Sequence, residues 1–151
     1  MSVCPVYLAI KHGHCEALAV LLQHEDIYED EERLILASQY GHAHICKYLL
    51  DIGMDHFSDE ALHTAIEYNY IEVIKLLLDH GVDIESLNEQ NETPLCYAIG
   101  ICRRNIAKLL IERGANTNIW AIGCRYWSNA ERLEAATDII SILTELRDHK
   151  N

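Results

Sequence analysis

Two short stretches rich in histidine and cysteine carry the residue types that bind transition metals. They are His12-Gly13-His14-Cys15 and His42-Ala43-His44-Ile45-Cys46, in a chain of nine histidines and six cysteines. Zinc sites are usually built from ligand pairs spaced as C-x-x-C or H-x-x-x-H. Neither spacing supports a site here, so we predict no metal site and no cofactor.

The same residues are weak candidates for catalysis. A covalent mechanism needs a nucleophile whose side chain faces a base. Cys15 follows His14 directly, and adjacent residues of a helix do not face each other. The acidic residues between Glu25 and Glu32 lack the glycine and the spacing of a calcium loop, and no glycine-rich phosphate loop occurs. We therefore predict no catalytic residue, and we predict that the protein is not an enzyme.

The charge of the chain excludes several classes of partner. The formal net charge is -12, which argues against nucleic acid and against an anionic membrane surface. A solvated acidic surface explains this charge without any partner. The alternative is a partner that presents a basic or amphipathic segment, attracted electrostatically.

The cysteines and the apolar runs bear on location. Cys46 and Cys96 lie within helical apolar patterns, where cysteine acts as a small hydrophobic residue. We therefore predict a reducing, cytoplasmic environment, in which Cys4 or Cys124 is the exposed and reactive thiol. The sequence contains no apolar run long enough for a transmembrane helix, and its first residues do not resemble a secretory signal.

The element that positions these residues is a helix pair, clearest between Asn91 and Asn116. Thr93 is suited to cap a first helix that begins at Pro94, and Gly114 is suited to end a second helix that begins near Asn105. The pattern recurs, because the Gly of His80-Gly81-Val82-Asp83 precedes Gly114 by 33 positions. Each helix has one apolar side, so a single pair needs similar neighbours to bury it.

The period of 33, the Thr-Pro-Leu at Thr93, the central Ala98 and the Leu-Leu ending before Gly114 are typical of one family. The chain resembles ankyrin-repeat proteins from Cys4 to Asn118. The resemblance implies an all-α solenoid of stacked helix-turn-helix pairs forming a single domain over 1–151. The expected repeats are 4–27, 32–55, 60–83, 91–116 and 119–148. In this family the histidines equivalent to His14, His42 and His63 have structural roles in hydrogen bonding.

The connections between the repeats differ in length. Gly13-His14, Gly41-His42 and Asn69-Tyr70 follow one another at intervals of 28, so the early connections are five residues shorter than the family period. We expect short loops in the N-terminal half and β-hairpin fingers in the C-terminal half. Such short connections resemble ankyrin arrays of giant viruses and intracellular pathogens.

The last repeat is expected to be a degenerate C-terminal cap. We expect a first helix over about 128–134 and a second over 137–146, with Thr137 or Asp138 near its start. Glu131 and Arg132 stand where the family has small apolar residues, which predicts the polar outer face of a cap.

Superposing the repeats predicts the core. The residues predicted to be buried are Val6, Leu8, Ala9, Leu18, Leu21, Leu22, Leu34, Leu36, Ala37, Ile45, Leu49, Leu50, Leu62, Ala65, Val73, Ile74, Leu77, Leu95, Ala98, Ile106, Leu109, Leu110, Ile139, Ile142 and Leu143.

The resemblance implies a protein-interaction module that binds another protein on its concave face, here acidic and bearing tyrosines. The positions carried over are Lys11, His12, Gln39, Tyr40, Glu67, Tyr68, Gly100 and Ile101 at the helix ends, and Leu87, Glu89, Gln90, Glu92 and Trp120 on the fingers. Tyr40 and Tyr68 suit binding hot spots, with mutual stacking as the alternative, and Trp120 has burial as its alternative.

Two further functions remain open. One is a self-associating scaffold, because the first repeat lacks a preceding hairpin and leaves one end of the stack poorly covered. The other is a recruiting adaptor or effector within a larger assembly. We expect a monomer, with a homo-oligomer as the alternative.

Overall fold

The structure is a computed structural model that describes residues 4–23, 32–118 and 128–149. The chain divides into two compact units, residues 1–82 (unit 1) and residues 83–151 (unit 2). Every regular element in the described ranges is an α-helix, which agrees with the predicted stack of helix pairs. The continuity of one domain over 1–151 stays a prediction.

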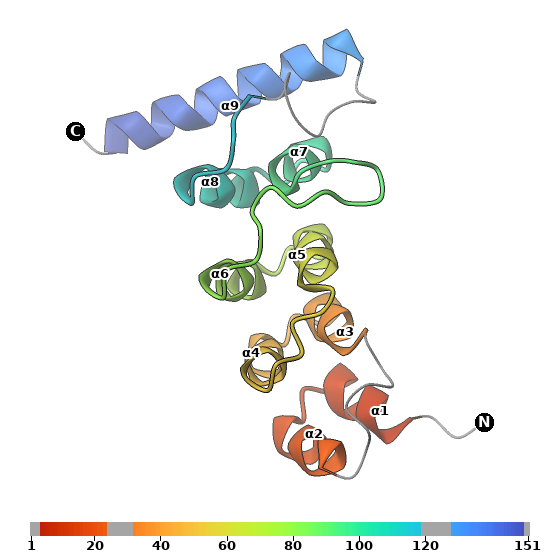
Figure 1. The fold of residues 1–151 in the computed structure, drawn as a ribbon. Helices are drawn as coiled ribbons and strands as arrows, with labels where there is room; N and C mark the ends of the chain where they lie inside the picture. The colour runs from red at the N-terminus through yellow and green to blue at the C-terminus, as the bar shows by residue number, and fades with distance from the viewer. Residues whose placement is uncertain (1–3, 24–31, 119–127, 150–151) are drawn as a thin grey trace. The chain divides into compact units, whose positions relative to one another are not determined.

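Unit 1 contains three helix pairs (Figure 1). Contacts join the first helices of successive pairs to one another, and they also join the second helices. The first helices are α1 (Pro5–Lys11), α3 (Arg33–Gln39) and α5 (Ser58–Glu67), and the second helices are α2 (Cys15–Leu22), α4 (Ala43–Asp51) and α6 (Ile71–Asp79). This is the arrangement that the repeat pattern predicts.

The turn within each pair of unit 1 requires a left-handed residue. Gly13, Gly41 and Asn69 occupy equivalent positions, with φ of 77°, 73° and 66°. Glycine adopts this conformation without steric cost, and asparagine tolerates it better than most residues. The turn residues identified from the 28-residue interval are therefore explained by backbone geometry.

Successive turns of unit 1 lie against one another. The Nε2 atoms of His42 and His44 lie 3.0 Å from the carbonyl oxygens of Lys11 and Gly13, respectively. His42 therefore belongs to the repeat next to that of His14, and its imidazole bonds the preceding turn. This confirms for His42 the structural role that the resemblance implies.

Unit 2 contains a helix pair and one long helix. The pair is α7 (Pro94–Gly100) and α8 (Arg104–Glu112), and the long helix is α9 (Asn129–His149). The Thr93 hydroxyl accepts a hydrogen bond from the backbone N–H of Cys96 at 3.3 Å, which confirms the predicted cap. Gly114 ends the pair at φ 92°, also as predicted.

The predicted division of the last repeat into two helices is wrong. A capping box starts α9, because Ser128 N–H donates to Glu131 at 2.6 Å and Glu131 N–H donates to the Ser128 hydroxyl at 3.2 Å. The helix continues through Thr137, whose hydroxyl donates to the Leu133 carbonyl instead of capping a new helix. Threonine can bond to the preceding turn in this way without ending a helix.

The predicted β-hairpin fingers are not supported. The loop before α7 turns on Asn88, whose N–H donates to the Glu92 carbonyl and whose carbonyl accepts from the Asn91 N–H. No strand forms in the described residues of this loop, since these bonds do not extend into a ladder. The second predicted finger, with Trp120, lies largely outside the described residues.

Most predicted core residues are buried or half-buried, and two are not. Leu8 is 40% exposed and Leu143 is 42% exposed. Leu8 follows Tyr7 on a helix of seven residues whose buried side is formed by Val6, Ala9 and Ile10. Leu143 lies beside Ile142, which takes the buried position on α9. Each of these two leucines is adjacent in sequence to a residue of the buried side and projects from a neighbouring, exposed side of its helix.

Candidate protein-binding surfaces

The predicted binding residues of unit 1 occupy equivalent places at three helix ends. Each pair consists of the last helical residue and the residue that caps it: Lys11 with His12, Gln39 with Tyr40, and Glu67 with Tyr68. Because α1, α3 and α5 stack in order, their ends form one row. We call this row the helix-end surface.

Hydrogen bonds between side chains connect the helix-end surface. The hydroxyls of Tyr7 and Tyr40 lie 3.1 Å apart, and the Gln39 amide donates to the Tyr68 hydroxyl at 3.2 Å. The bond to Tyr7, with burial and the neighbouring phenols, raises the pKa of Tyr40 above its usual range. The contacts of Tyr40 and Tyr68 are thus hydrogen bonds, and Tyr68 remains 45% exposed.

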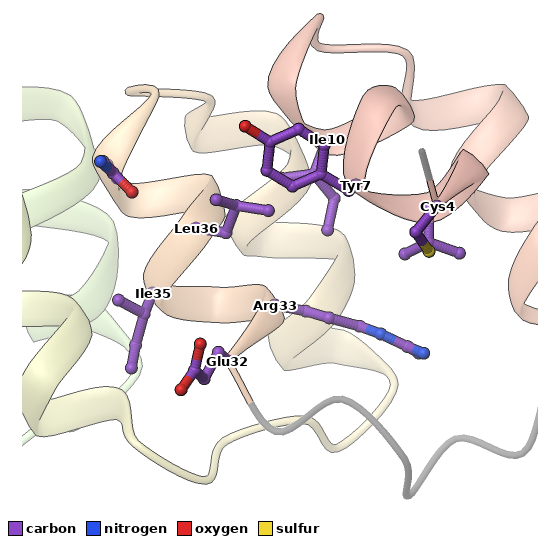
Figure 2. Close-up of a pocket in the computed structure, with 9 residues that line it drawn as sticks. Cys4, Tyr7, Ile10, Glu32, Arg33, Ile35 and Leu36 are labelled. Atoms are coloured by element: carbon purple, nitrogen blue, oxygen red, sulfur yellow. The ribbon is translucent and has the colours of Figure 1, made fainter. Parts of the chain in front are cut away.

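A cavity of about 400 Å³ lies between α1 and α3, next to this row. Figure 2 shows Tyr7 and Ile10 from α1 facing Leu36 from α3, while Arg33 extends toward the side where Cys4 lies. Sequence reasoning missed Tyr7. Its spacing of four from Lys11 was the available signal, since such residues share a helix face, and the Lys11 ammonium lies 5.8 Å from the Tyr7 ring centroid.

A second cavity, of about 430 Å³, lies within unit 2 between the end of α7 and α9. We call it the acidic hollow. The described residues of its lining are four carboxylates and six uncharged residues: Glu92, Tyr97, Ile99, Gly100, Ile101, Cys102, Glu131, Glu134, Ala135 and Asp138. The predicted residues Glu92, Gly100 and Ile101 are thus brought together with three carboxylates of α9 that sequence reasoning did not select.

Hydrogen bonds favour the ionised form of two carboxylates of α9, Glu131 in the lining of the hollow and Glu145 near it. The backbone and side-chain bonds of Ser128 lower the pKa of Glu131. Arg104 donates to Glu145 at 2.6 Å and to Ser141 at 2.9 Å, and its hydrogen bond to Glu145, together with its charge, lowers the pKa of that carboxyl. Arg104 is 3.9 Å from Asp138, farther than from Glu145, so its charge is directed mainly to a carboxylate outside the lining.

The remaining predicted residues lie in the loop before α7 or outside the described ranges. Leu87 is 52% exposed, and Glu89 and Gln90 are also exposed. The Asn88 side chain organises this loop by accepting from the N–H groups of Gln90 and Glu92. Trp120 lies outside the described residues.

The negative charge predicted for one face is unevenly distributed. On the helix-end surface Lys11 offsets Glu67, and the two tyrosines and Gln39 are neutral. In unit 2, four carboxylates surround one hollow. The two surfaces therefore differ in the side chains they can bind, one presenting phenols and apolar groups and the other presenting negative charge.

The cysteines fall into three groups. Burial raises the pKa of the Cys46 thiol to about 11, and Cys4, Cys15 and Cys102 are also free. Cys96 is buried on α7, as its apolar pattern predicts, and it is the one described cysteine that is not free. The described residues include no group of three or more His, Cys, Asp or Glu placed to hold a metal ion.

None of the described helices combines the length and the apolar character that crossing a bilayer demands.

The stacked pairs and their turns agree with comparisons to known proteins. The family model described as ankyrin repeats (3 copies) matches residues 34–120, which is more than half of the chain. No curated protein matches the sequence. Ankyrin repeats are generally protein–protein interaction modules and are typically non-catalytic. On the family match and the helix pairs together, the chain belongs to the ankyrin-repeat family.

Proposed function

We propose that this protein is a non-catalytic interaction module that binds a basic, amphipathic segment of another protein in the acidic hollow. One observation carries the proposal. Four carboxylates from the loop before α7 and from α9 line a cavity of about 430 Å³, and the other described residues of its lining are uncharged. Such a lining would pair with an arginine or lysine from outside.

The neutral residues of the lining indicate which groups the partner would present beside its positive charge. Tyr97 and Ile101 are half-buried on one side of the hollow, opposite the carboxylates of α9. A guanidinium group can bond a carboxylate through two N–H groups and can also stack on an aromatic ring. An arginine flanked by apolar residues would therefore use both sides of the hollow, and lysine would use mainly the charged side.

The helix-end surface is a second binding surface in this proposal. Its phenols and the cavity beside Tyr7 suit apolar and aromatic side chains better than charged ones. The cytoplasmic location predicted from the cysteine pattern stays a prediction.

The acidic hollow can be tested with synthetic peptides. The probe is a fluorescein-labelled 12-residue peptide that alternates Arg with Leu, and its counterpart has Glu in place of Arg. We expect only the Arg peptide to bind, measured by fluorescence anisotropy. We expect the Glu134→Gln/Asp138→Asn variant to bind it about tenfold more weakly, equivalent to about 1.4 kcal/mol.

A matched control separates the hollow from general attraction to a negatively charged chain. Glu16→Gln/Glu112→Gln removes the same number of charges at exposed sites outside the lining. We expect its affinity to stay within about twofold of wild type, since exposed charges at a distance are screened by salt. Equal losses for the two double variants would overturn the proposal, provided that circular dichroism shows both to be folded.

A further inference from the structure

Helix α9 carries a second apolar side that is not part of the core. Leu133 is 66% exposed, Ile140 is 64% exposed and Leu143 is 42% exposed, and Ala136 lies between them half-buried. The two leucines and Ile140 account for three of the nine large hydrophobic residues that are exposed in the described chain. We call Leu133, Ala136, Ile140 and Leu143 the outer stripe.

The outer stripe is separate from the packed side of α9. With 3.6 residues per turn, it lies roughly a third of a turn from Ala135, Ile139 and Ile142, which are buried. On the other side of the packed residues, away from the outer stripe, lie the carboxylates Glu134, Asp138 and Glu145. The helix therefore has a packed side, an acidic side and an apolar outer side.

The spacing within the outer stripe is that of a coiled-coil seam. Its intervals are three, four and three residues, so its members occupy alternating a and d positions of a heptad. A terminal helix of a repeat array is expected to have a polar outer side, and that was the prediction from Glu131 and Arg132. In the structure Glu131 lines the acidic hollow and Arg132 only borders the outer stripe, so the outer side is apolar instead.

The flanks of the outer stripe are free of carboxylates. Thr137 and Thr144 border it on one side, and Arg132, Ile139 and Leu146 border it on the other. The chain carries a net charge of -12, so carboxylates on both copies would oppose self-association wherever they meet. Two copies with a net charge of -12 each can approach along this stripe without bringing carboxylates face to face.

We propose that the outer stripe pairs with the α9 helix of a second copy of this chain, in antiparallel orientation. An antiparallel seam places a positions opposite d positions. Leu133 then faces Leu143 of the second copy, and Ala136 faces its Ile140, so a small residue meets a large one. A parallel seam would place Ala136 opposite Ala136 and leave a gap. A two-fold axis requires this kind of self-complementary patch.

The dimer is weak because the stripe is short. Stable specific interfaces bury at least about 1,200 Å² in total, and a seam of three large side chains per copy falls below that. We expect a dissociation constant on the order of 100 μM. Because the contact is apolar, the association should change little with salt, unlike peptide binding in the acidic hollow.

Sedimentation velocity on the full chain from about 5 to 500 μM tests the proposal, with a non-reducing gel to exclude covalent dimers. We expect the weight-average sedimentation coefficient of wild type to rise with concentration. Ile140→Glu should abolish the rise, and Ala130→Glu, which adds the same charge to an exposed position of α9 outside the stripe, should preserve it. A wild type that stays monomeric, or an Ile140→Glu variant that still dimerises, overturns the proposal.

A second variant tests the antiparallel register. Ala136→Ile makes the stripe more apolar, but it places a large residue opposite Ile140 of the second copy. We expect at least threefold weaker association, since overpacking a fitted contact is unfavourable. Stronger association would mean that the contact is non-specific, and it would overturn the proposed pairing. Circular dichroism checks that each variant retains the helical content of wild type.

Discussion

Unit 1 and unit 2 hold their helices together by different chemistry. In unit 1 the turns bond to one another through imidazole rings and backbone carbonyls, with His42 against the Lys11 carbonyl and His44 against the Gly13 carbonyl. In unit 2 the long helix α9 is attached to α8 by charged groups, with Arg104 bonded to Glu145 and Ser141.

The contrast follows from how each contact is repeated. Equivalent turns recur every 28 residues in unit 1, so one ring can cover the glycine of the preceding turn at each step. Helix α9 does not repeat the helix pairs, and its attachment is made by side chains that no other repeat supplies. Substitutions that change the backbone conformation of a turn should therefore weaken the contacts between the turns of unit 1. Substitutions that remove a charge should weaken the attachment of α9 in unit 2.

The largest effect is expected from Gly41→Ala in unit 1. Gly41 has φ 73°, and a Cβ atom at this position would overlap the Tyr70 ring. We expect a loss of about 2–4 kcal/mol in the free energy of unfolding, from left-handed strain and displacement of the ring. Urea unfolding followed by circular dichroism measures this loss.

Gly81→Ala is the matched control in the same unit. It has φ 85°, but nothing lies within 4 Å of its Cβ position, so only the strain of about 1–2 kcal/mol remains. Equal losses at Gly41 and Gly81 would show that the contact between turns contributes nothing.

A smaller effect is expected from Arg104→Ala in unit 2. Arg104 and Glu145 are 44% and 47% exposed, and ion pairs in such settings contribute up to about 1 kcal/mol. We expect faster hydrogen exchange in peptides from α9 and unchanged exchange in α1–α6. Arg147→Ala is the control, because that side chain is 73% exposed and pairs with its sequence neighbour Asp148 at 3.7 Å. A similar change for both arginines would contradict the assigned attachment.

The smallest effect is the pH dependence of the same contact. The hydrogen bond from Arg104 lowers the pKa of Glu145, so the folded state favours the ionised carboxylate. The resulting stabilisation is present above the ordinary pKa of glutamate and is lost as the pH falls through the lowered pKa. We expect the Tm difference between wild type and Glu145→Gln to be largest at pH 7 and to vanish at low pH. A difference that does not change with pH would contradict this linkage.

The sequence predicted the regular part of the fold because its signals are local. Thr93 and Gly114 specify where helices begin and end through their own backbone and capping chemistry. The failure at Thr137 is equally instructive, because a threonine inside a helix and a threonine at a helix start look alike in sequence. The pair Ser128 and Glu131 was the better signal, since its spacing is that of a capping box.

The candidate sites were predicted in part. Glu92 and Ile101 were selected by repeat position, and they do line the acidic hollow. Their neighbours Glu131 and Asp138 could not be selected, because more than 25 residues separate them from Ile101 in the chain. Only the packing of α9 beside α7 brings these groups together.

The sequence by itself determined the helix pairs and the turns between them, since glycine conformation and apolar periodicity act over a few residues. Tertiary structure alone decided which side of α9 is buried. The helix has apolar residues around more than half of its circumference, and its own pattern allows either Ile139 or Ile140 to face the core. Contact with α7 buries Ile139 and leaves Ile140 exposed, because burial depends on what the neighbouring helices present.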